Sequence, residues 1–272
     1  MKTLVALIAA LPLLAAAAPQ KVVALGGDVT EIVYALGAQQ MLVARDSTSQ
    51  WPPEAARLPD VGYLRQLNAE GILATRPTLV LASVQAQPSL ALKQVADNQV
   101  QVVTVPGSDA VTAIDDKIRV VAAALGKQHE GEALRKQVAA GLAALPTAPL
   151  NKRVLFILSH GGMSAMAAGE QTGADAAIRA AGLQNAMQGV KRYQPLSQEG
   201  VIASQPDLVV ISRDGVQSMG GEAALWALPG LAQTPAGKHR QVLEVDDMAL
   251  LGFSVRTPAA IQQLRQKAEQ LP

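Results

Sequence analysis

A 17-residue stretch of this chain is present twice. Residues 67–83 read LNAEGILATRPTLVLAS, and residues 196–212 read LSQEGVIASQPDLVVIS. The copies align without a gap at a shift of 129 residues, and eight positions are identical. Each copy predicts a short helix that is followed by a β-branched strand. Two such units half a chain apart predict two similar lobes, and two lobes enclose a cleft.

The remaining pattern predicts an α/β fold with two doubly wound, mostly parallel sheets. Short apolar runs such as KVVALGG and MLVA alternate with helical patterns, and Asp28 or Thr30 could cap the first helix, which ends at Gly37. Between 110 and 145 two helices follow one another, and RVLFILS then restarts the alternation. We therefore expect an N-terminal lobe at 19–126, one long connecting helix at 127–149 and a C-terminal lobe at 150–272. The alternative is one continuous sheet without a cleft.

The first 18 residues predict a secretory signal peptide. Lys2 is followed by an apolar core from Leu4 to Leu14, and Ala16 to Ala18 form an Ala-x-Ala cleavage site. The alternative is a buried N-terminal helix. Because no cysteine stands at the cleavage site, we expect an exported, soluble protein of the periplasm rather than a lipid-anchored one. The net charge of +1 does not indicate a strongly basic surface of the kind that binds nucleic acid.

The layout resembles a known class of transport protein. A signal peptide, two α/β lobes, one connecting helix and the motif E-x-(I/V)-(L/I)-A-x-x-P in each lobe are similar to the cobalamin, siderophore and haem class of periplasmic binding proteins, which feed ABC importers. The segments DVGYLRQLNAEGILATRPTLVLAS and LSHGGMSAMAAGEQTGADAAIRAAGLQNA resemble the haemin-binding members. The resemblance implies a monomeric, non-enzymatic protein that passes haem to a permease dimer in the inner membrane, downstream of an outer-membrane haem receptor.

Tyr63 is the candidate axial ligand of haem iron in the first lobe. Gly62 permits a tight bend that could turn the ring outward, and a phenolate is a hard, anionic donor that suits ferric iron. A phenol ordinarily ionises only near pH 10, so binding would need help from the iron and from a nearby cation, for which Arg65 is the candidate. Without the resemblance, Tyr63 would be interpreted as a packed surface ring.

His160 is the candidate ligand from the second lobe. It follows the predicted strand 154–159, and ligands of open α/β lobes bind beyond the carboxyl ends of strands. A histidine at a strand end can equally be a local hydrogen-bonding residue, but some haemin binders of this type use Tyr from one lobe and His from the other. One haem between Tyr63 and His160, or two stacked haems with one ligand each, are both compatible with this pair. The resemblance to the two-haem subtype favours the second.

Other candidate contacts follow from what haem requires, a flat apolar slot with cations for its propionates. Met163 and Met166 could face the porphyrin or could be plain core. The propionate candidates are Arg65, Arg192 and Arg213, although most surface arginines are simply solvated.

The repeated glutamates, Glu70 and Glu199, occupy the same place in the two copies, in the first turn of each helix. There a carboxylate complements the helix dipole. The resemblance implies that Glu70 and Glu199 dock onto arginines of the permease.

The second copy has no tyrosine at the position that corresponds to Tyr63. The gapless alignment of the two copies places Arg192 there.

Competing functions fit the sequence less well. A ferric siderophore or cobalamin is the rival ligand, but such clefts tend to be built from several aromatics and this chain has only seven. A secreted hydrolase would need the G-x-S-x-G elbow, and Met166 replaces the last glycine after Ser164. A zinc or manganese site would need a cluster of metal-ligating side chains, which three scattered histidines cannot supply. Of these, His129 and His239 are interpreted as solvated.

Overall fold

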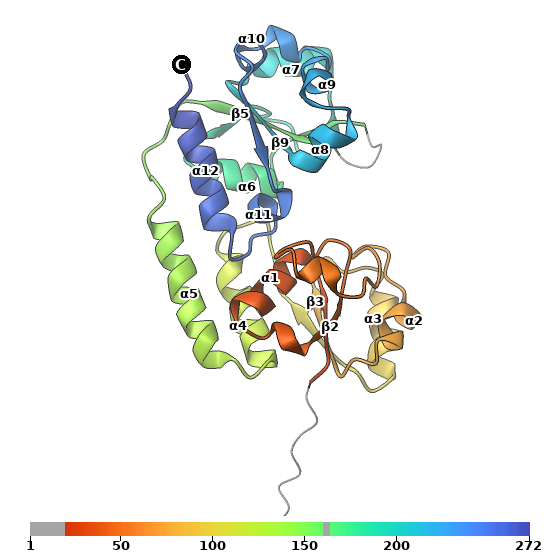
Figure 1. Ribbon diagram of the computed structural model, residues 1–272. Helices are drawn as coiled ribbons and strands as arrows, with labels where there is room; N and C mark the ends of the chain where they lie inside the picture. Colours follow the sequence, from red (N-terminus) through yellow and green to blue (C-terminus); the bar gives the residue numbers. More distant parts are fainter. Residues whose placement is uncertain (1–19, 160–163) are drawn as a thin grey trace, which may run out of the picture.

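The computed structural model describes residues 20–159 and 164–272, and these form two α/β lobes that face each other (Figure 1). The predicted signal peptide at 1–18 lies outside the described residues. In the first lobe the elements are β1 (Val22–Leu25), α1 (Gly27–Ala35), η1 (Gln39–Met41), β2 (Leu42–Arg45), η2 (Ala55–Arg57), α2 (Ala69–Ala74), β3 (Leu79–Ser83), α3 (Ser89–Asp97), β4 (Gln101–Val105) and α4 (Ala113–Ala124).

The second lobe follows helix α5 (Gln128–Ala143). Its elements are β5 (Arg153–Leu158), β6 (Met166–Ala168), α6 (Gly173–Ala180), β7 (Gln184–Asn185), β8 (Tyr193–Pro195), α7 (Gln198–Ser204), β9 (Leu208–Ser212), α8 (Arg213–Ser218), α9 (Glu222–Trp226), η3 (Leu231–Gln233), α10 (Pro235–Lys238), β10 (Val242–Val245), α11 (Asp247–Leu251) and α12 (Thr257–Glu269).

The sheet of the first lobe is parallel throughout, with strand order β2-β1-β3-β4. Its central strands β1 and β3 are buried on both faces, so their sequences are continuous apolar runs rather than alternating ones. Alternate residues point to opposite faces, one covered by α1 and α4 and the other by α2 and α3. Complete burial of a Leu or Ile side chain contributes about 1.5–3 kcal/mol, and these two layers stabilise the lobe.

The sheet of the second lobe is mixed. Strands β10, β9 and β5 are parallel, and β7 pairs with β5 in the same sense. Strands β6 and β8 extend the sheet on the other side of β5 in antiparallel orientation. Helices α6, α11 and α12 cover one face, and α7 to α10 cover the other. The predicted two-lobe α/β class is confirmed, and the antiparallel extension is an addition to the mostly parallel sheet that was expected.

The two copies of the repeat form equivalent units. The copies become α2 with β3 and α7 with β9. Asn68 caps α2 by accepting a hydrogen bond from the Glu70 amide, and Ser197 caps α7 by accepting one from the Gly200 amide. The copies differ at the residue before the strand, where Thr78 corresponds to Asp207.

Thr78 and Asp207 nevertheless perform the same task. Thr78 Oγ1 accepts from the Lys21 amide at 2.9 Å, and Asp207 Oδ2 accepts from the Arg153 amide at 2.7 Å. In each lobe this hydrogen bond joins the residue just before one central strand to the start of the adjacent central strand. The substitution therefore preserves the geometry that the repeat predicts.

The predicted cap of the first helix is wrong. Helix α1 begins at Gly27, its N-cap is Gly26, and neither Asp28 nor Thr30 caps it. The loop after β2 supplies acceptors instead: Asp46 Oδ1 accepts from the Gly26 amide at 2.9 Å and Thr48 Oγ1 accepts from the Gly27 amide at 3.0 Å. Because these acceptors lie 20 and 21 residues away, local spacing could not reveal them.

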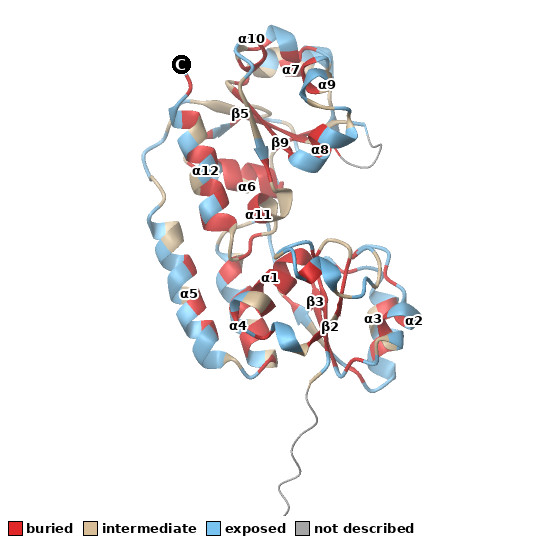
Figure 2. Cartoon of the chain, viewed as in Figure 1, coloured by how far each residue is buried: buried red, intermediate tan, exposed pale blue. Residues whose placement is uncertain are grey.

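Helix α5 lies along one side of the molecule, within the segment 127–149 that was expected to connect the lobes (Figure 1). It packs against α4 of the first lobe and against α12 of the second. Gly131 permits the close approach to α4, because a Cβ there would lie 2.5 Å from the Ala122 Cβ. Much of the helix is solvent-exposed (Figure 2). That α5 acts as a stiff connector, and that the lobes divide at 126 and 150, remain predictions.

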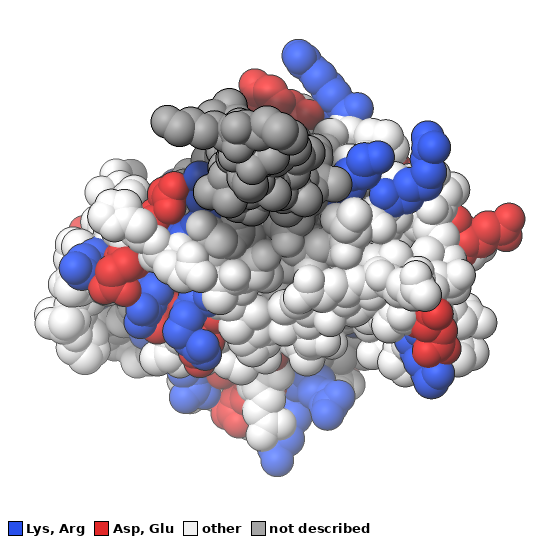
Figure 3. All heavy atoms as spheres, turned by 90° about the horizontal axis from the view of Figure 1, so that it is seen from below, with Lys and Arg blue, Asp and Glu red and all other residues white. Residues whose placement is uncertain are grey.

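The surface carries charges of both signs. On the face shown in Figure 3, Lys and Arg side chains are interspersed with Asp and Glu side chains rather than gathered into a patch of one sign. Among the residues described, we find no helix with the length and apolarity that a membrane crossing needs.

Candidate functional site

The carboxyl ends of the parallel strands of both sheets meet in the space between the lobes. The residues that follow β1, β2 and β3 line this space from the first lobe, and the ends of β5, β9 and β10 line it from the second. This is where open α/β sheets bind ligands. The predicted cleft therefore arises because the repeat places the same strand ends on facing lobes.

The cleft has two compartments. Compartment 1 has a volume of about 760 Å³ and contains Trp51, Arg213 and Arg256 in its wall. Compartment 2 has a volume of about 730 Å³ and contains Arg65 and Tyr193. Both volumes lie within the range of about 300–1,000 Å³ that is typical of small-molecule sites.

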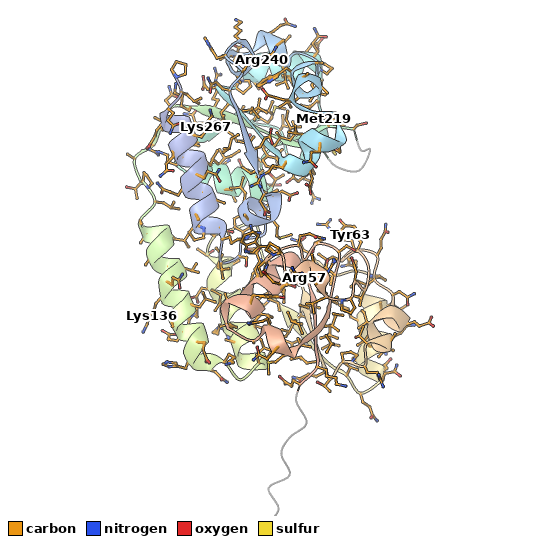
Figure 4. All side chains as sticks on the ribbon, in the orientation of Figure 1. Arg57, Tyr63, Lys136, Met219, Arg240 and Lys267 are labelled. Atoms are coloured by element: carbon orange, nitrogen blue, oxygen red, sulfur yellow. The ribbon has the colours of Figure 1, made fainter. Side chains whose placement is uncertain are left out.

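Three residues line both compartments and mark their boundary, namely Tyr63 from the first lobe and Asp247 and Met248 from the second. A ligand in either compartment would therefore contact the same tyrosine. Figure 4 shows Tyr63 on the side of the first lobe that faces the second lobe.

Tyr63 is held outward by the loop that precedes it. Gly62 has φ of +103°, in the left-handed region that favours glycine, and its amide donates to Asp60 Oδ1 at 2.8 Å. Asp60 is itself anchored by Arg45, whose Nη1 lies 2.8 Å from Oδ2. Tyr63 remains 42% exposed, close to the 44% of Trp51, the other exposed large aromatic among the described residues. The bend predicted at Gly62 is confirmed, and Tyr63 lines the cleft beyond it.

The three predicted propionate arginines divide between the compartments. Arg65 and Arg192 line compartment 2, and Arg213 lines compartment 1. Arg65 Nη2 donates to Gln85 Oε1 at 2.9 Å, which steadies the guanidinium at the rim. Arg213 is the first residue of α8, immediately after the carboxyl end of β9. All three are exposed, so each compartment has positive charge available for an anionic group of a ligand.

Two of the predicted residues, His160 and Met163, lie outside the described residues, as do their neighbours Gly161 and Gly162. Strand β5 ends at Leu158, which lines compartment 2. Met166 is half-buried in β6 opposite Leu158 and is not among the described residues that line either compartment. Met248 supplies a methionine at the boundary instead.

Acidic side chains give the boundary a distinct electrostatic character. Burial raises the pKa of the Asp247 carboxyl, and the nearby Asp246 and Asp214 carboxylates raise it further. Burial also opposes ionisation of Asp246, but hydrogen bonds from Arg256 and from the Ala249 amide hold the pKa of that carboxyl below its ordinary value. Asp247 is therefore the carboxyl at the boundary that is more readily protonated.

A partly buried ionic cluster joins the lobes beside compartment 1. Arg256, just before α12, contacts Glu31 of α1 and also pairs with Asp246 Oδ2 at 2.7 Å. Its guanidinium lies 4.6 Å from the centre of the Trp51 ring, within the range for a cation–π contact.

A hydrogen bond from a lysine of the first lobe also joins the lobes nearby. Lys117 Nζ contacts Asp28 at 2.6 Å and donates to the Gly252 carbonyl at 2.7 Å. Asp28 and Lys117 belong to the first lobe, whereas Gly252 follows α11 of the second. Together with the Arg256 contacts, this bond fixes the α11–α12 corner against the start of α1.

Glu70 and Glu199 lie outside both compartments. Each is exposed in the first turn of its helix, α2 in one lobe and α7 in the other. Their equivalent settings follow from the equivalent caps at Asn68 and Ser197. A partner that contacts one could contact the other only by spanning both lobes (Figure 1).

Sequence reasoning missed several residues that line the cleft: Trp51, Tyr193, Asp247, Met248 and Arg256. The scarcity of aromatics was the signal that could have found Trp51 and Tyr193, since the chain has only two Trp and three Tyr. The other three follow the carboxyl end of β10, a strand that lies beyond the repeat and was not predicted.

Comparison with known proteins agrees with this architecture. The apo form of the periplasmic heme-binding protein RhuT from Roseiflexus sp. RS-1 is 40% identical, with a TM-score of 0.88 over 92% of this chain and 98% of that one. The heme-binding protein BhuT in complex with two hemes is 41% identical, with a TM-score of 0.84 over 92% and 97%. HutB of Vibrio cholerae, also a heme-binding protein, is 34% identical, with a TM-score of 0.79 over 92% and 98%.

Curated relatives include proteins with a different printed ligand. A vitamin B12-binding protein of Vibrio vulnificus is 26% identical over 269 residues, 97% of this chain and 96% of the relative. One from Pectobacterium carotovorum is 38% identical over 87 residues, about a third of the length of each protein. An uncharacterized ABC transporter substrate-binding lipoprotein of Bacillus subtilis is 25% identical over 235 residues, 84% of this chain and 73% of the relative.

The model of the family described as "Periplasmic binding protein" matches residues 22–249, which span both lobes and the cleft between them. The resemblance inferred from the sequence is thereby confirmed at the level of the family. This chain belongs to the periplasmic binding proteins.

Proposed function

We propose that this protein captures haem in the interlobe cleft and delivers it to an ABC importer of the inner membrane. The observation that carries the proposal is the position of Tyr63, an exposed phenol held outward at the boundary of two compartments that each contain arginine. A phenolate ligates ferric iron, and arginines on either side suit the propionates. The high identity to haem-binding proteins over the whole fold supports the same ligand.

The proposed binding mode assigns each group a role. Tyr63 supplies the axial oxygen to ferric iron, and His160 supplies the ligand from the second lobe. Arg65 and Arg192 would receive a propionate in compartment 2, and Arg213 would receive one in compartment 1. Met163 is retained as a proposed porphyrin contact, whereas Met166 lines neither compartment and is not.

The number of haems follows from how the compartments are used. One haem would span the boundary with Tyr63 and His160 on opposite faces. Two stacked haems would each take one of these ligands, and the structure of BhuT with two hemes makes this the favoured arrangement. A titration end-point of one or two equivalents separates the two.

Cobalamin is the second candidate ligand, because vitamin B12-binding proteins are among the relatives. Competition decides between the two. The purified protein is dialysed against equimolar haemin and cyanocobalamin, and the retained ligand is measured by its absorption. We expect haemin to be retained in excess, whereas preferential retention of cyanocobalamin would overturn the proposal.

Delivery is proposed to use the two exposed glutamates. Glu70 and Glu199 would pair with arginines on the two subunits of a permease dimer, one contact for each lobe. Exposed ion pairs contribute only about 0.2–1 kcal/mol each, so the pair would orient the complex more than tighten it. We further propose that the protein is exported by a cleaved signal peptide, acts as a monomer downstream of an outer-membrane receptor and catalyses no reaction.

A further inference from the structure

Tyr193 is a second phenol of the cleft, contributed by the second lobe. It begins strand β8, pairs in register with Ala168 of β6, and lines compartment 2 together with Tyr63 and Arg65. Its ring packs against the core of the second lobe around α6, α11 and α12, so it is half-buried rather than freely exposed. A ring anchored in this way has a fixed position in the wall of the cleft.

The repeat explains why Tyr193 occupies this place. Tyr63 stands four residues before the first copy and Tyr193 stands three residues before the second. The gapless alignment pairs Tyr63 with Arg192, which hides the neighbouring tyrosine. Because the segment ahead of each copy leads into the cleft, each lobe contributes one phenol from nearly the same place in its fold.

The two phenols differ in their surroundings. Burial, with added repulsion from the Asp109 and Asp247 carboxylates, raises the pKa of Tyr193 to about 12, although the Arg65 guanidinium opposes this. Tyr193 therefore stays protonated at neutral pH, and a protonated phenol is a hydrogen-bond donor rather than an anionic iron ligand. Tyr63, in contrast, is 42% exposed and has no comparable packing.

The hydroxyl of Tyr193 is available to a ligand. Tyr193 lines compartment 2 and is only half-buried, so its side chain can be reached from the cleft. The same compartment is lined by two cations, Arg65 and Arg192, and by the carboxyls of Asp28, Asp109 and Asp247, so the arginines are the groups that would draw an anion to this region. A neutral donor beside two cations matches a carboxylate, which accepts several hydrogen bonds at once.

We propose that Tyr193 donates a hydrogen bond from its phenol to a carboxylate of the ligand in compartment 2 and does not bind iron. The inference rests on the proposed haem function, because it takes the carboxylate to be a haem propionate. It adds a specificity residue from the second lobe: the phenol would distinguish a porphyrin with free acid side chains from one whose acids are masked.

The experiment uses Tyr193→Phe, which keeps the packed ring and removes only the hydroxyl. Tyr34→Phe is the matched control, since Tyr34 lies in α1 and lines neither compartment. Each protein is titrated with haemin and with haemin dimethyl ester. A hydrogen bond to a charged acceptor contributes enough that its loss weakens binding about 10-fold or more.

We expect Tyr193→Phe to weaken haemin binding about 10-fold with an unchanged visible spectrum of the ferric complex, and to leave binding of the dimethyl ester unchanged. Equal haemin affinity in wild type and Tyr193→Phe would refute the hydrogen bond. A changed ferric spectrum would show instead that Tyr193 ligates iron. If wild type does not bind haemin at all, the proposed function fails and this inference fails with it. Thermal unfolding of each variant shows whether any loss is due to misfolding.

Discussion

Replacing Arg256 with Met should destabilise the apo protein in a pH-dependent way. Arg256 compensates Glu31, a carboxyl on α1 whose side chain is only 1% exposed and whose Oε2 is buried without a hydrogen-bond partner among the described residues. Burial already raises the pKa of Glu31 above its ordinary value of 4.5, and the hydrogen bond and charge of Arg256 oppose that rise. Without Arg256, the pKa of Glu31 must rise further, and the folded protein will hold the carboxyl in its protonated form.

The magnitude follows from the difference in protonation between the folded and unfolded states. Glu31 would stay protonated when folded but ionise near 4.5 when unfolded, so stability falls as pH rises above 4.5, by about 1.4 kcal/mol per pH unit. The loss of folding free energy that comes from protonation of Glu31 is therefore at most about 3.4 kcal/mol at pH 7 and about 0.7 kcal/mol at pH 5. Loss of the Asp246 pair and of the Trp51 stacking adds about 1 kcal/mol at both values of pH.

Urea unfolding at pH 5 and pH 7 measures these terms. We expect Arg256→Met to lose about 3–4 kcal/mol at pH 7, a fall in Tm of roughly 6–15 °C, and only about 1–2 kcal/mol at pH 5. The double variant Arg256→Met with Glu31→Gln should show no such pH dependence. Arg119→Met, which breaks an exposed pair with Asp116, should cost less than about 0.5 kcal/mol. A loss for Arg256→Met that is equal at the two pH values would refute the reasoning.

Three further predictions concern binding and delivery. His160→Ala should remove only the second equivalent of haemin in a titration if two haems stack; removal of all binding would support a single haem held by both ligands. Glu70→Gln combined with Glu199→Gln should lower haem uptake by cells while haemin affinity stays the same, and a fall in affinity would place these carboxylates in the cleft instead. Solution X-ray scattering should show only a small change in radius of gyration when haemin binds, because the Arg256 and Lys117 contacts already join the lobes. A large contraction would contradict a stiff connection.

Local pattern was sufficient to predict the parts of the fold that repeat. The paired helix and strand units and the bend at Gly62 both depend on residues that are close in sequence. Strands β6 and β8 escaped prediction because each has only three residues, too few to show an alternating pattern. Their antiparallel pairing depends on a partner strand rather than on their own composition.

The site was predictable only in part, for a similar reason. Tyr63, Arg65, Arg192 and Arg213 were candidates from the sequence and line the cleft, while their roles toward a ligand remain predictions. The Arg256 and Glu31 pair joins residues 225 positions apart, and no local spacing encodes such a contact. Tyr193 was missed because it stands one residue closer to its copy of the repeat than Tyr63 does, so the gapless alignment does not pair the two tyrosines.

Stoichiometric titration of the purified protein with haemin, followed by visible absorption, tests the central claim most directly. Wild type and the Tyr34→Phe control should saturate at one or two equivalents with a high-spin ferric tyrosinate spectrum. Tyr63→Phe should lose that spectrum and bind far more weakly, while its thermal unfolding stays close to that of wild type because Tyr63 is exposed. A wild-type spectrum that is indistinguishable from free haemin, or a Tyr63→Phe titration identical to wild type, would contradict haem ligation in this cleft.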